Sequence, residues 1–534
     1  MVSGIALNFP KLLASIIPTS TYPPSLKSNQ EWHQEMSKHH SSKSNADRSI
    51  FIGFLILMLW LPLPLGSNRP WAWAIMEIWI FSLALAWLWG FLRGYLSLTP
   101  VFSKAKPILI LFLLWLFYIA FQCISLPFSL VEWLSPEAAY MHTLAATQSI
   151  PPTTATLSVD PHITTVSLLK SISYILLFIL TLLLVNRRKR LRWLAYTLVF
   201  SGLFQAVYGG LMTLSGMEYG FFHEKIYYLE VATGTFVNRN HLAGYLEMCL
   251  AIGIGLLIAQ LSDSTSKTWR QHLRSVVDWL LSDKMRLRLY LVVMVIALVL
   301  TRSRMGNTSF FASMLIAGII GLMLSRHATR ATVILLVSLI VIDMLIVGAW
   351  FGIDKVAQRL QQTSFAAETR DEVDVYTLPY WQDYLWVGSG LGSFPVVFPR
   401  YRQQDVRQFF DHAHNDYLEF GAETGIIGLL LVGSSVILSL FIALLAQYRR
   451  RDPLCRGIAF SAVMSITAIL IHSSVDFNLQ IPANAATFMV ILAMAWIAYF
   501  LRSHKQHRHR RKSTVSKLID RERESHSPPA GPPT

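Results

Sequence analysis

The chain has 534 residues, of which 53% are hydrophobic and 14% charged, and its formal net charge is +15 at pH 7. The apolar residues gather in blocks of about 20, which match the thickness of a bilayer core, and this excludes a soluble globular protein. The positive charge does not require a nucleic acid partner, because much of it lies in short loops and in the tail, where it would face anionic lipid.

Residues 1–49 form a polar segment before the first apolar block. The segment lacks the apolar run and cleavage site of a signal peptide, and we expect a cytoplasmic tail. Met36 opens a short basic stretch within it and is an alternative to Met1 as the start of translation. Residues 502–534 are basic and end in a proline-rich stretch, which predicts a disordered, surface-associated cytoplasmic tail.

Hydrophobicity predicts an all-α polytopic membrane protein with about twelve transmembrane helices. These form an N-terminal group in residues 50–233 and a second group in residues 234–501. The predicted spans are 50–66, 71–92, 107–126, 166–185, 193–213, 240–261, 289–301, 308–325, 332–352, 425–446, 457–473 and 484–501.

Lys and Arg set the predicted orientation, because they concentrate in cytoplasmic loops. They fill alternate short loops, such as the one from Arg187 to Arg192, and are absent from the loop 127–165. Both termini are therefore expected in the cytoplasm. The longest outside loop, 352–413, then lies between spans nine and ten.

Two polar stretches follow the N-terminal group. Asn238 and Arg239 stand where the sixth span begins, and a charge at that depth is costly unless it is paired or faces water. Arg239 is thus a candidate binding residue, with a snorkelling interface arginine as the alternative. Arg302 and Arg304 end the seventh span at the outer surface, against the charge rule. They indicate an anion site for a phosphate-rich headgroup. The alternative is that they form salt bridges to the weakly acidic outside loop 127–165.

The long outside loop contains Gly388, Gly390 and Gly392. A dinucleotide-binding loop is rejected, because no βαβ context exists, and glycines here favour a tight turn or a close backbone approach to a ligand. Nearby aromatic residues are candidates for stacking on sugars or for anchoring at the interface: Tyr380, Trp381, Tyr384, Trp386 and Phe394.

The segment 411–428, DHAHNDYLEFGAETGIIG, runs from a polar loop into an apolar helix. Asp416 is the predicted N-cap, with Glu419 three residues later completing a capping box. Gly421, Gly425 and Gly428 form a small-residue stripe that would let another transmembrane helix approach. His412 and His414 precede the helix, where an imidazole exchanges protons near neutral pH. In a later outside turn, Asp476 and Asn478 either orient His414 or a sugar hydroxyl or cap the turn.

Four motifs in this order resemble the bacterial O-antigen ligase and polymerase superfamily: GTFVNRNHLAGYL, TRSRMG, the glycine run and HAHNDYLEFGAETGIIG. The similarity covers roughly residues 234–484. It implies transfer of an undecaprenyl-diphosphate-linked glycan on the periplasmic face of the bacterial inner membrane, without nucleotide sugar, metal or cofactor, in polysaccharide or lipopolysaccharide biosynthesis.

The resemblance implies that Arg304, Arg302 and Arg239 bind the donor diphosphate and that His414 acts on the acceptor hydroxyl. Such a base contributes about 10²- to 10⁴-fold, and arginines stabilise the departing diphosphate. Attack opposite this leaving group would invert the anomeric centre. The expected supporting residues are Asn415, Asp416, Glu419, His412, Asn238 and Asp476. Met305 departs from the small residue expected there, and His412 offers a second imidazole two residues from His414.

Several functions stay open on these residues. A ligase is favoured slightly over a polymerase, and its acceptor is a lipid, a glycan or a protein. A transporter of lipid-linked glycans would need charged or broken helices near the midplane, and the spans show few: Lys170 lies near an end, and Glu77 and Asp343 are isolated. A non-catalytic scaffold is a further alternative. So is a metal-dependent enzyme that uses His412, His414 and outside carboxylates.

Overall fold

The computed structural model describes residues 47–146, 152–220, 224–261, 283–324, 337–338, 370–406 and 408–501. Its one sheet is a two-residue antiparallel pair, β1 (Leu126–Pro127) with β2 (Thr154–Ala155). All other elements are helices, α or 3₁₀: α3 (Arg48–Trp60), η1 (Leu65–Ser67), α4 (Pro70–Leu92), α5 (Pro100–Lys104), α6 (Lys106–Gln122), α7 (Phe128–Leu134), α8 (Pro136–Ala145), α9 (Pro161–Leu184), α10 (Arg188–Ser215), α11 (Arg239–Leu261), α14 (Asp283–Leu300), α15 (Arg304–Leu324), α18 (Arg370–Asp383), α19 (Phe394–Val397), η3 (Phe398–Arg400), α20 (Asp416–Arg449), α21 (Pro453–His472), η4 (Asn478–Gln480) and α22 (Pro482–Phe500).

Within these residues, eight helices are long and apolar enough to cross a membrane: α4, α9, α10, α11, α15, α20, α21 and α22. The helices α3 and α6 are apolar but shorter, and α14 overlaps the predicted span 289–301. The prediction of an all-α polytopic membrane protein is confirmed. The predicted span 332–352 and both predicted tails fall almost wholly outside the described residues, so the total of twelve spans and the domain limits stay predictions.

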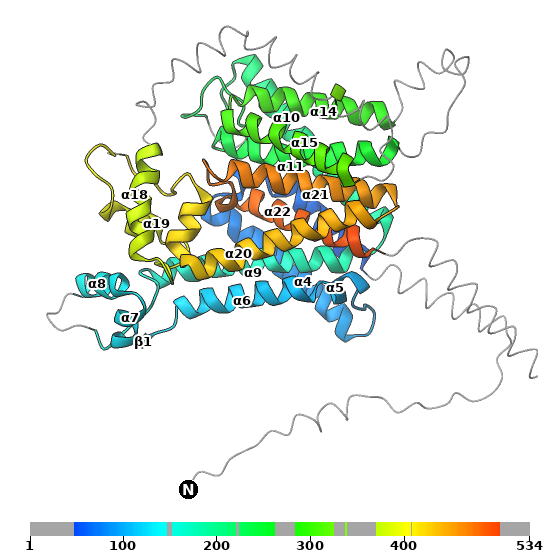
Figure 1. Cartoon of the computed structure of the whole chain (residues 1–534). Coiled ribbons are helices and arrows are strands. Elements are labelled where there is room, and N and C mark those ends of the chain that lie inside the picture. Colours follow the sequence, from blue (N-terminus) through cyan, green and yellow to red (C-terminus); the bar gives the residue numbers. More distant parts are fainter. Residues whose placement is uncertain are drawn as a thin grey trace, which may run out of the picture.

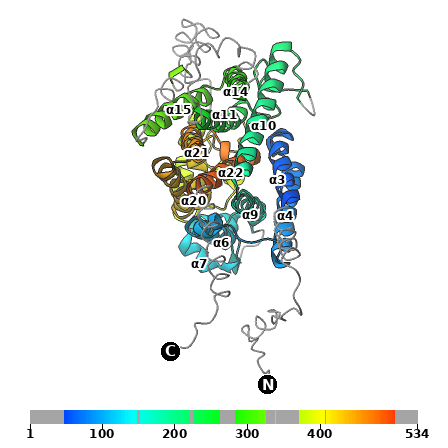
Figure 2. The same cartoon turned by 90° about the vertical axis from the view of Figure 1, so that its right-hand side faces the viewer.

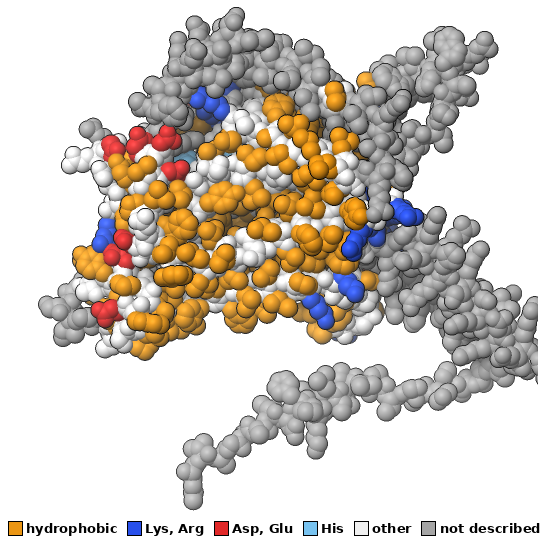
Figure 3. Space-filling model, in the orientation of Figure 1, with side chains coloured by type: hydrophobic (Ala, Val, Ile, Leu, Met, Phe, Trp, Pro, Cys, Tyr) orange, Lys and Arg blue, Asp and Glu red, His pale blue; other side chains and the backbone are white. Residues whose placement is uncertain are grey.

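The two ends of the helix bundle differ in charge. On the face shown in Figure 3, Asp and Glu gather at the end that α18 occupies, whereas Lys and Arg predominate at the opposite end. A broad apolar surface lies between them. This is the asymmetry that the positive-inside rule produces, and we refer to the end bearing α18 as the acidic end.

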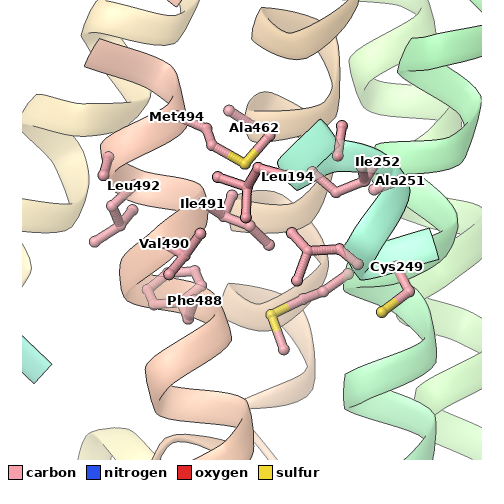
Figure 4. Packing of buried hydrophobic residues seen from close by; sticks show 14 of the residues in the cluster. Leu194, Cys249, Ala251, Ile252, Ala462, Phe488, Val490, Ile491, Leu492 and Met494 are labelled. Atoms are coloured by element: carbon pink, nitrogen blue, oxygen red, sulfur yellow. The ribbon is translucent and has the colours of Figure 1, made fainter. Parts of the chain in front are cut away.

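The helices α11, α21 and α22 form the centre of the bundle. Other parts of the protein bury 94%, 78% and 83% of their apolar windows, against 22% for α4. Figure 4 shows buried side chains of these helices, among them Ile252 of α11, Ala462 of α21 and Met494 of α22. A side chain added at Gly255 of α11 would collide with the backbone of α21, so glycine permits the close approach of these two helices.

Two groups of helices flank this centre (Figures 1 and 2). On one side lie α10, α14 and α15, and on the other lie α4, α6, α9 and α20. The elements α7, α8, α18 and α19 cover the acidic end and join α20 where that helix begins (Figure 1).

A second, smaller core holds α18 and α19 together at the acidic end. Tyr380, Tyr384 and Phe394 are almost completely buried in it. These three rings are therefore not available to stack on sugars, contrary to one of the two roles predicted for them. Trp386 is 63% exposed and can still take either role. The described part of the long loop is thus a folded unit.

The helix α20 is broken at Gly425, which has φ +62° and ψ −174°. The glycine-rich segment 385–390 fills the break: the Ser389 and Gly390 amides donate to the carbonyls of Ala422 and Glu423 at 3.1 and 2.9 Å. In return, the Ile426 amide donates to the Leu385 carbonyl at 2.8 Å. The segment therefore completes hydrogen bonds that the break leaves open.

This arrangement corrects the predicted role of the glycine stripe. Gly421 lies against the Trp381 ring, and Gly425 lies against the Trp386 backbone. Both therefore receive the outside loop, not another transmembrane helix; of the three, Gly428 alone comes near a helix of the bundle, α6, at Tyr118. Gly388 allows a close approach to the backbone of α20, because a side chain there would collide with the Glu423 carbonyl. Gly390 and Gly392 instead lie against the side chains of Ser158 and Ser167, and the predicted close approach to a ligand stays a prediction.

Candidate functional site

The start of α20 is capped one residue earlier than predicted. The N-cap is Asn415, whose Oδ1 accepts hydrogen bonds from the Tyr417 and Leu418 amides at 3.1 and 3.2 Å. Asp416 is the first helical residue, and its carboxylate accepts instead from the Ser473 hydroxyl at 2.7 Å. The predicted capping box is wrong, because Glu419 turns toward the preceding loop.

Glu419 is buried and holds that loop at two points. One oxygen lies 2.7 Å from His412 Nδ1, and the other accepts from the Ala413 amide at 2.8 Å. Burial lowers the pKa of His412, but the charge and the hydrogen bond of Glu419 outweigh it and raise this pKa to about 9. His412 is therefore a cation at neutral pH.

His414 occupies a sparsely populated backbone region, with φ +58°. Non-glycine residues adopt this left-handed conformation at a cost, and such strain often accompanies functional sites. Its Nδ1 lies 3.9 Å from Oδ1 of Asp476, and its side chain is mostly buried. The imidazole of His412 thus faces Glu419 and that of His414 faces Asp476, although only Ala413 separates the two histidines in the sequence.

Phe477 lies among three imidazole rings. The His412 ring stacks on it with a centroid distance of 4.4 Å. The rings of His414 and His241 each meet it edge to face at 4.6 Å. These contacts bring together the starts of α11 and α20 and the turn after α21, which are far apart in the sequence.

Asp476 carries the carboxylate at the centre of this cluster. Its Oδ2 accepts a hydrogen bond from the Asn240 amide group, and its Oδ1 lies 3.6 Å from His241 Nε2. Burial opposes the charge, but the hydrogen bond and charge of His241 and the charges of His472 and His414 hold the pKa of Asp476 below its usual range. Asp476 is therefore an anion at neutral pH. It lies within ion-pair distance of His414, and its Oδ1 also accepts from the Phe477 amide at 2.8 Å within the turn.

A second buried pair lies beneath the cluster. His472 Nδ1 is 2.8 Å from Glu247 Oε1, and both side chains are fully buried. Sequence analysis did not select either residue. Glu247 had a usable signal, because a carboxylate inside an apolar span is a functional candidate by default.

Two of the three candidate arginines begin helices at the same end of the bundle. Arg239 is the first residue of α11, and its guanidinium lies 5.7 Å from the centroid of the Tyr228 ring. Arg304 is the first residue of α15. Gly306 lies so close to Ala243 that a side chain there would collide, and this contact packs the first turn of α15 against α11.

Arg302 and Arg304 are exposed, and neither forms an ion pair with any residue that the structure describes. Arg302 has φ +52° and so shares the strained conformation of His414. The alternative of salt bridging to the acidic outside loop is not seen here. In that loop Glu137 pairs with Arg400, and Asp160 caps α9.

Asn238 supports the start of α11, since its Oδ1 accepts from the Asn240 amide at 2.9 Å. It is therefore a structural neighbour of Arg239. Asn478 also has a structural partner, because its Oδ1 accepts from the Asn484 side chain at 3.0 Å. Met305 is half-buried at the start of α15.

A cavity of about 560 Å³ opens beside His412 and Glu419. Its walls come from α4, α6, α9, α20 and α22. A metal centre was the other alternative for His412 and His414. In the described part of the chain, no group of three or more His, Cys, Asp and Glu side chains is placed to hold a metal ion.

Residues 289–433 match a protein family described as O-antigen ligase. The chain carries an O-antigen ligase domain. The resemblance to the superfamily is confirmed, and it connects this membrane protein with O-antigen and polysaccharide biosynthesis. No curated protein matches the chain.

The O-antigen ligase match runs from within α14 to within α20 and so includes Arg302, Arg304, His412 and His414. Asp476, with its partners Asn240 and His241, lies outside the matched segment. The fold brings these residues close to His412 and His414 of the matched segment. The cluster is therefore built jointly by the matched segment and by the helices before and after it.

Proposed function

We propose that this O-antigen ligase family protein transfers an undecaprenyl-diphosphate-linked glycan to an acceptor hydroxyl at the acidic end, with His414 as general base. The observation that carries this proposal is the different environment of the two loop histidines. Glu419 holds His412 as a cation, which cannot accept a proton. His414 faces the anionic Asp476 and is the imidazole suited to proton acceptance.

Asp476 would act on the base through its charge. Its Oδ1 lies 3.9 Å from Nδ1 of His414, beyond hydrogen-bonding distance, and an anion at this distance stabilises the imidazolium that forms during transfer. We assign proton acceptance to Nε2 of His414, the ring nitrogen that does not face Asp476. The acceptor oxygen then attacks the anomeric carbon, and the bond from that carbon to the diphosphate oxygen breaks.

The diphosphate gathers negative charge as it leaves, and Arg239, Arg302 and Arg304 are proposed to bind it. Arginine suits this role, because it stays charged and binds phosphate oxygens through two parallel hydrogen bonds. The products are the extended acceptor and undecaprenyl diphosphate, with inversion at the anomeric carbon. An anomer analysis that finds retention would refute the displacement geometry.

We further propose that the acidic end faces the periplasm and that both termini are in the cytoplasm of a bacterial inner membrane. The charge asymmetry between the two ends supports this orientation. The reaction needs no metal or cofactor in this proposal, since the arginines neutralise the leaving group.

The proposal is tested by complementation of a strain that lacks this gene, at matched membrane levels. His414→Gln and Arg304→Ala should abolish glycan transfer, whereas Arg93→Ala should not, because Arg93 is an exposed arginine just after the C-terminal end of α4. Long lipid-linked chains left unattached would indicate a ligase, and accumulation of single lipid-linked repeats would indicate a polymerase. Full transfer by both site variants would refute the catalytic role of the cluster.

A further inference from the structure

A second cavity, of about 520 Å³, lies at the end of the bundle opposite the acidic end, and we call it the basic-end cavity. Its walls come from the beginnings of α10, α14 and α21 and from the end of α11. The helices α10, α11 and α14 lie together on one flank of the bundle (Figures 1 and 2). His241 of the histidine cluster and Gln260 of this cavity lie near opposite ends of α11, about 30 Å apart at the rise of an α-helix. The cavity is therefore remote from the proposed transfer site.

Arginines dominate the charged lining of the basic-end cavity. Arg188 and Arg192 stand one turn apart on α10, and Arg286 lines the cavity from α14. Among the described residues that line it, Asp452 supplies the one carboxylate; it pairs with Arg188 and caps α21 by accepting from the Cys455 amide at 2.9 Å. Three guanidiniums thus face one carboxylate that is already engaged. The positive ends of α10, α14 and α21 add to this excess of positive charge.

The basic run 187–192 does not owe its whole charge to the positive-inside rule, because its members have different surroundings. Arg190 is engaged by Asp47, with a hydrogen bond of 2.6 Å, and lies 4.9 Å from the centroid of the Phe51 ring. Arg192 is exposed and pairs with no acidic residue in the part of the chain that the structure describes. Its guanidinium is therefore available to an anion that enters the cavity.

Gln260 adds a hydrogen-bond acceptor that the described protein groups leave unused. Its Nε2 donates to the Tyr196 hydroxyl at 3.0 Å, whereas its buried Oε1 has no hydrogen-bond partner in the described structure. Buried acceptors are normally satisfied. A ligand that fits this wall therefore carries a hydroxyl or N–H donor as well as a negative charge.

The apolar side of the cavity leads onto the outer surface of α10. Phe200 lines the cavity, is 47% exposed and meets the Tyr290 ring of α14 at a centroid distance of 5.6 Å. Phe204, Val207 and Leu211 continue this exposed face toward the other end of α10, at the spacing of one helix face. A hydrocarbon chain attached to a group in the cavity can follow this stripe, which a soluble anion would leave unused.

We propose that the basic-end cavity binds the head group of an anionic phospholipid that carries hydroxyls, the chemistry of phosphatidylglycerol. The phosphate diester lies at Arg192 and Arg286, a head-group hydroxyl donates to Gln260 Oε1, and an acyl chain follows α10. A zwitterionic lipid fits less well, because the arginines repel its ammonium group. Basic pockets between helices at the cytoplasmic surface suit such head groups. This site is separate from the proposed transfer reaction and does not depend on it.

Native mass spectrometry of the full-length protein, titrated with dioleoyl phosphatidylglycerol in detergent, tests this site. Dioleoyl phosphatidylcholine has the same chains and no net charge, and the wild type should bind it about tenfold more weakly. Arg192→Ala should weaken binding of phosphatidylglycerol about tenfold, through loss of a charge-assisted hydrogen bond to phosphate. Arg93→Ala is the matched control and should bind as the wild type does. Arg93 is an exposed arginine at the end of α4, a helix that begins at the cavity beside His412 and so ends at the same end of the bundle as Arg192.

Gln260→Leu tests the hydroxyl contact separately from the charge. It should weaken binding of phosphatidylglycerol several-fold and leave binding of dioleoyl phosphatidylmethanol unchanged, because that lipid has the same charge and no head-group hydroxyl. Equal weakening of both lipids would refute the hydroxyl contact at Gln260.

Three results would overturn the lipid site itself. Equal affinity of the wild type for phosphatidylglycerol and phosphatidylcholine would mean that the arginines do not recognise the head group. Equal loss in Arg192→Ala and Arg93→Ala would mean that binding reflects the overall positive charge of this end of the bundle. Displacement of the lipid by inorganic phosphate, but not by chloride at the same ionic strength, would assign the cavity to a soluble anion.

Discussion

Replacement of Glu419 by glutamine tests the electrostatic distinction between the two loop histidines. The carboxylate lies 2.7 Å from His412 Nδ1 and also accepts from the Ala413 amide. Glutamine keeps the shape and one carbonyl oxygen, which can retain the Ala413 bond, while its NH₂ group can donate to a neutral imidazole. The substitution therefore removes the charge and little else.

The expected change follows from the pKa of His412, which is raised from 6.5 to about 9. One pKa unit corresponds to 1.36 kcal/mol, so the folded protein stabilises the imidazolium by about 3 kcal/mol. In Glu419→Gln the burial remains and most of the attraction is lost, so the midpoint should fall by at least about 2 pH units.

The sign of the stability effect follows from the same shift. Because the pKa is raised in the folded state, the His412 contribution is fully present below about pH 6.5 and is lost as the pH rises to about 9. Glu419→Gln should therefore denature at a lower temperature than the wild type at about pH 6, and the two proteins should converge above about pH 9.5.

Diethyl pyrocarbonate modification followed by peptide mass spectrometry measures this pKa, because the reagent attacks the neutral imidazole. His162 is exposed and serves as the internal control, with the same pH profile in both proteins. A His412 midpoint near 7 in the wild type, or the same midpoint in both proteins, would refute the charge assignment and would return His412 to the candidates for general base.

Three further changes test other parts of the structure. Asp476→Asn should lower kcat by about 10² or more with little change in KM and should shift the pH profile of transfer, since an amide cannot stabilise the imidazolium of the base. A pH profile identical to that of the wild type would contradict this. Gly388→Ala should cost about 2–5 kcal/mol, from the left-handed backbone and the collision with α20, and should appear as loss of folded protein in fluorescence-detected size-exclusion chromatography; Gly433→Ala, with nothing within 4 Å, should be harmless. Asn415→Ala should lower stability by about 1 kcal/mol through loss of the N-cap. An unchanged melting temperature would mean that Asp416, and not Asn415, caps α20.

The sequence was informative where a local rule acts alone. Length and hydrophobicity identified the membrane helices, since a span needs about 20 apolar residues whatever it packs against. The paired motifs around Arg302, Arg304, His412 and His414 identified the family. The position of Asp476 in a polar outside turn also made it one candidate neighbour of His414, and the structure places the two 3.9 Å apart.

The errors arose where a distant segment overrides a local preference. Asn415 and Asp416 are equally good caps by residue type, and the choice depends on Ser473, which takes the Asp416 carboxylate. Gly421 and Gly425 permit close approach by any backbone, and only the fold shows that the approaching segment is the outside loop. The partnership of Glu247 with His472 joins residues 225 positions apart, and no local pattern indicates it.

The order in which the chain is synthesised affects how the broken helix α20 can enter the membrane. The carbonyls that it exposes accept from the Ser389 and Gly390 amides and from the side chains of Tyr118 and Gln122. All four donors leave the ribosome before α20 does. The helix therefore meets its hydrogen-bond partners as it is inserted, so its unpaired carbonyls need not enter the lipid, where each would cost several kcal/mol. A circular permutant in which α20 precedes residues 385–390 should lose this advantage and should insert poorly even though its final contacts are the same.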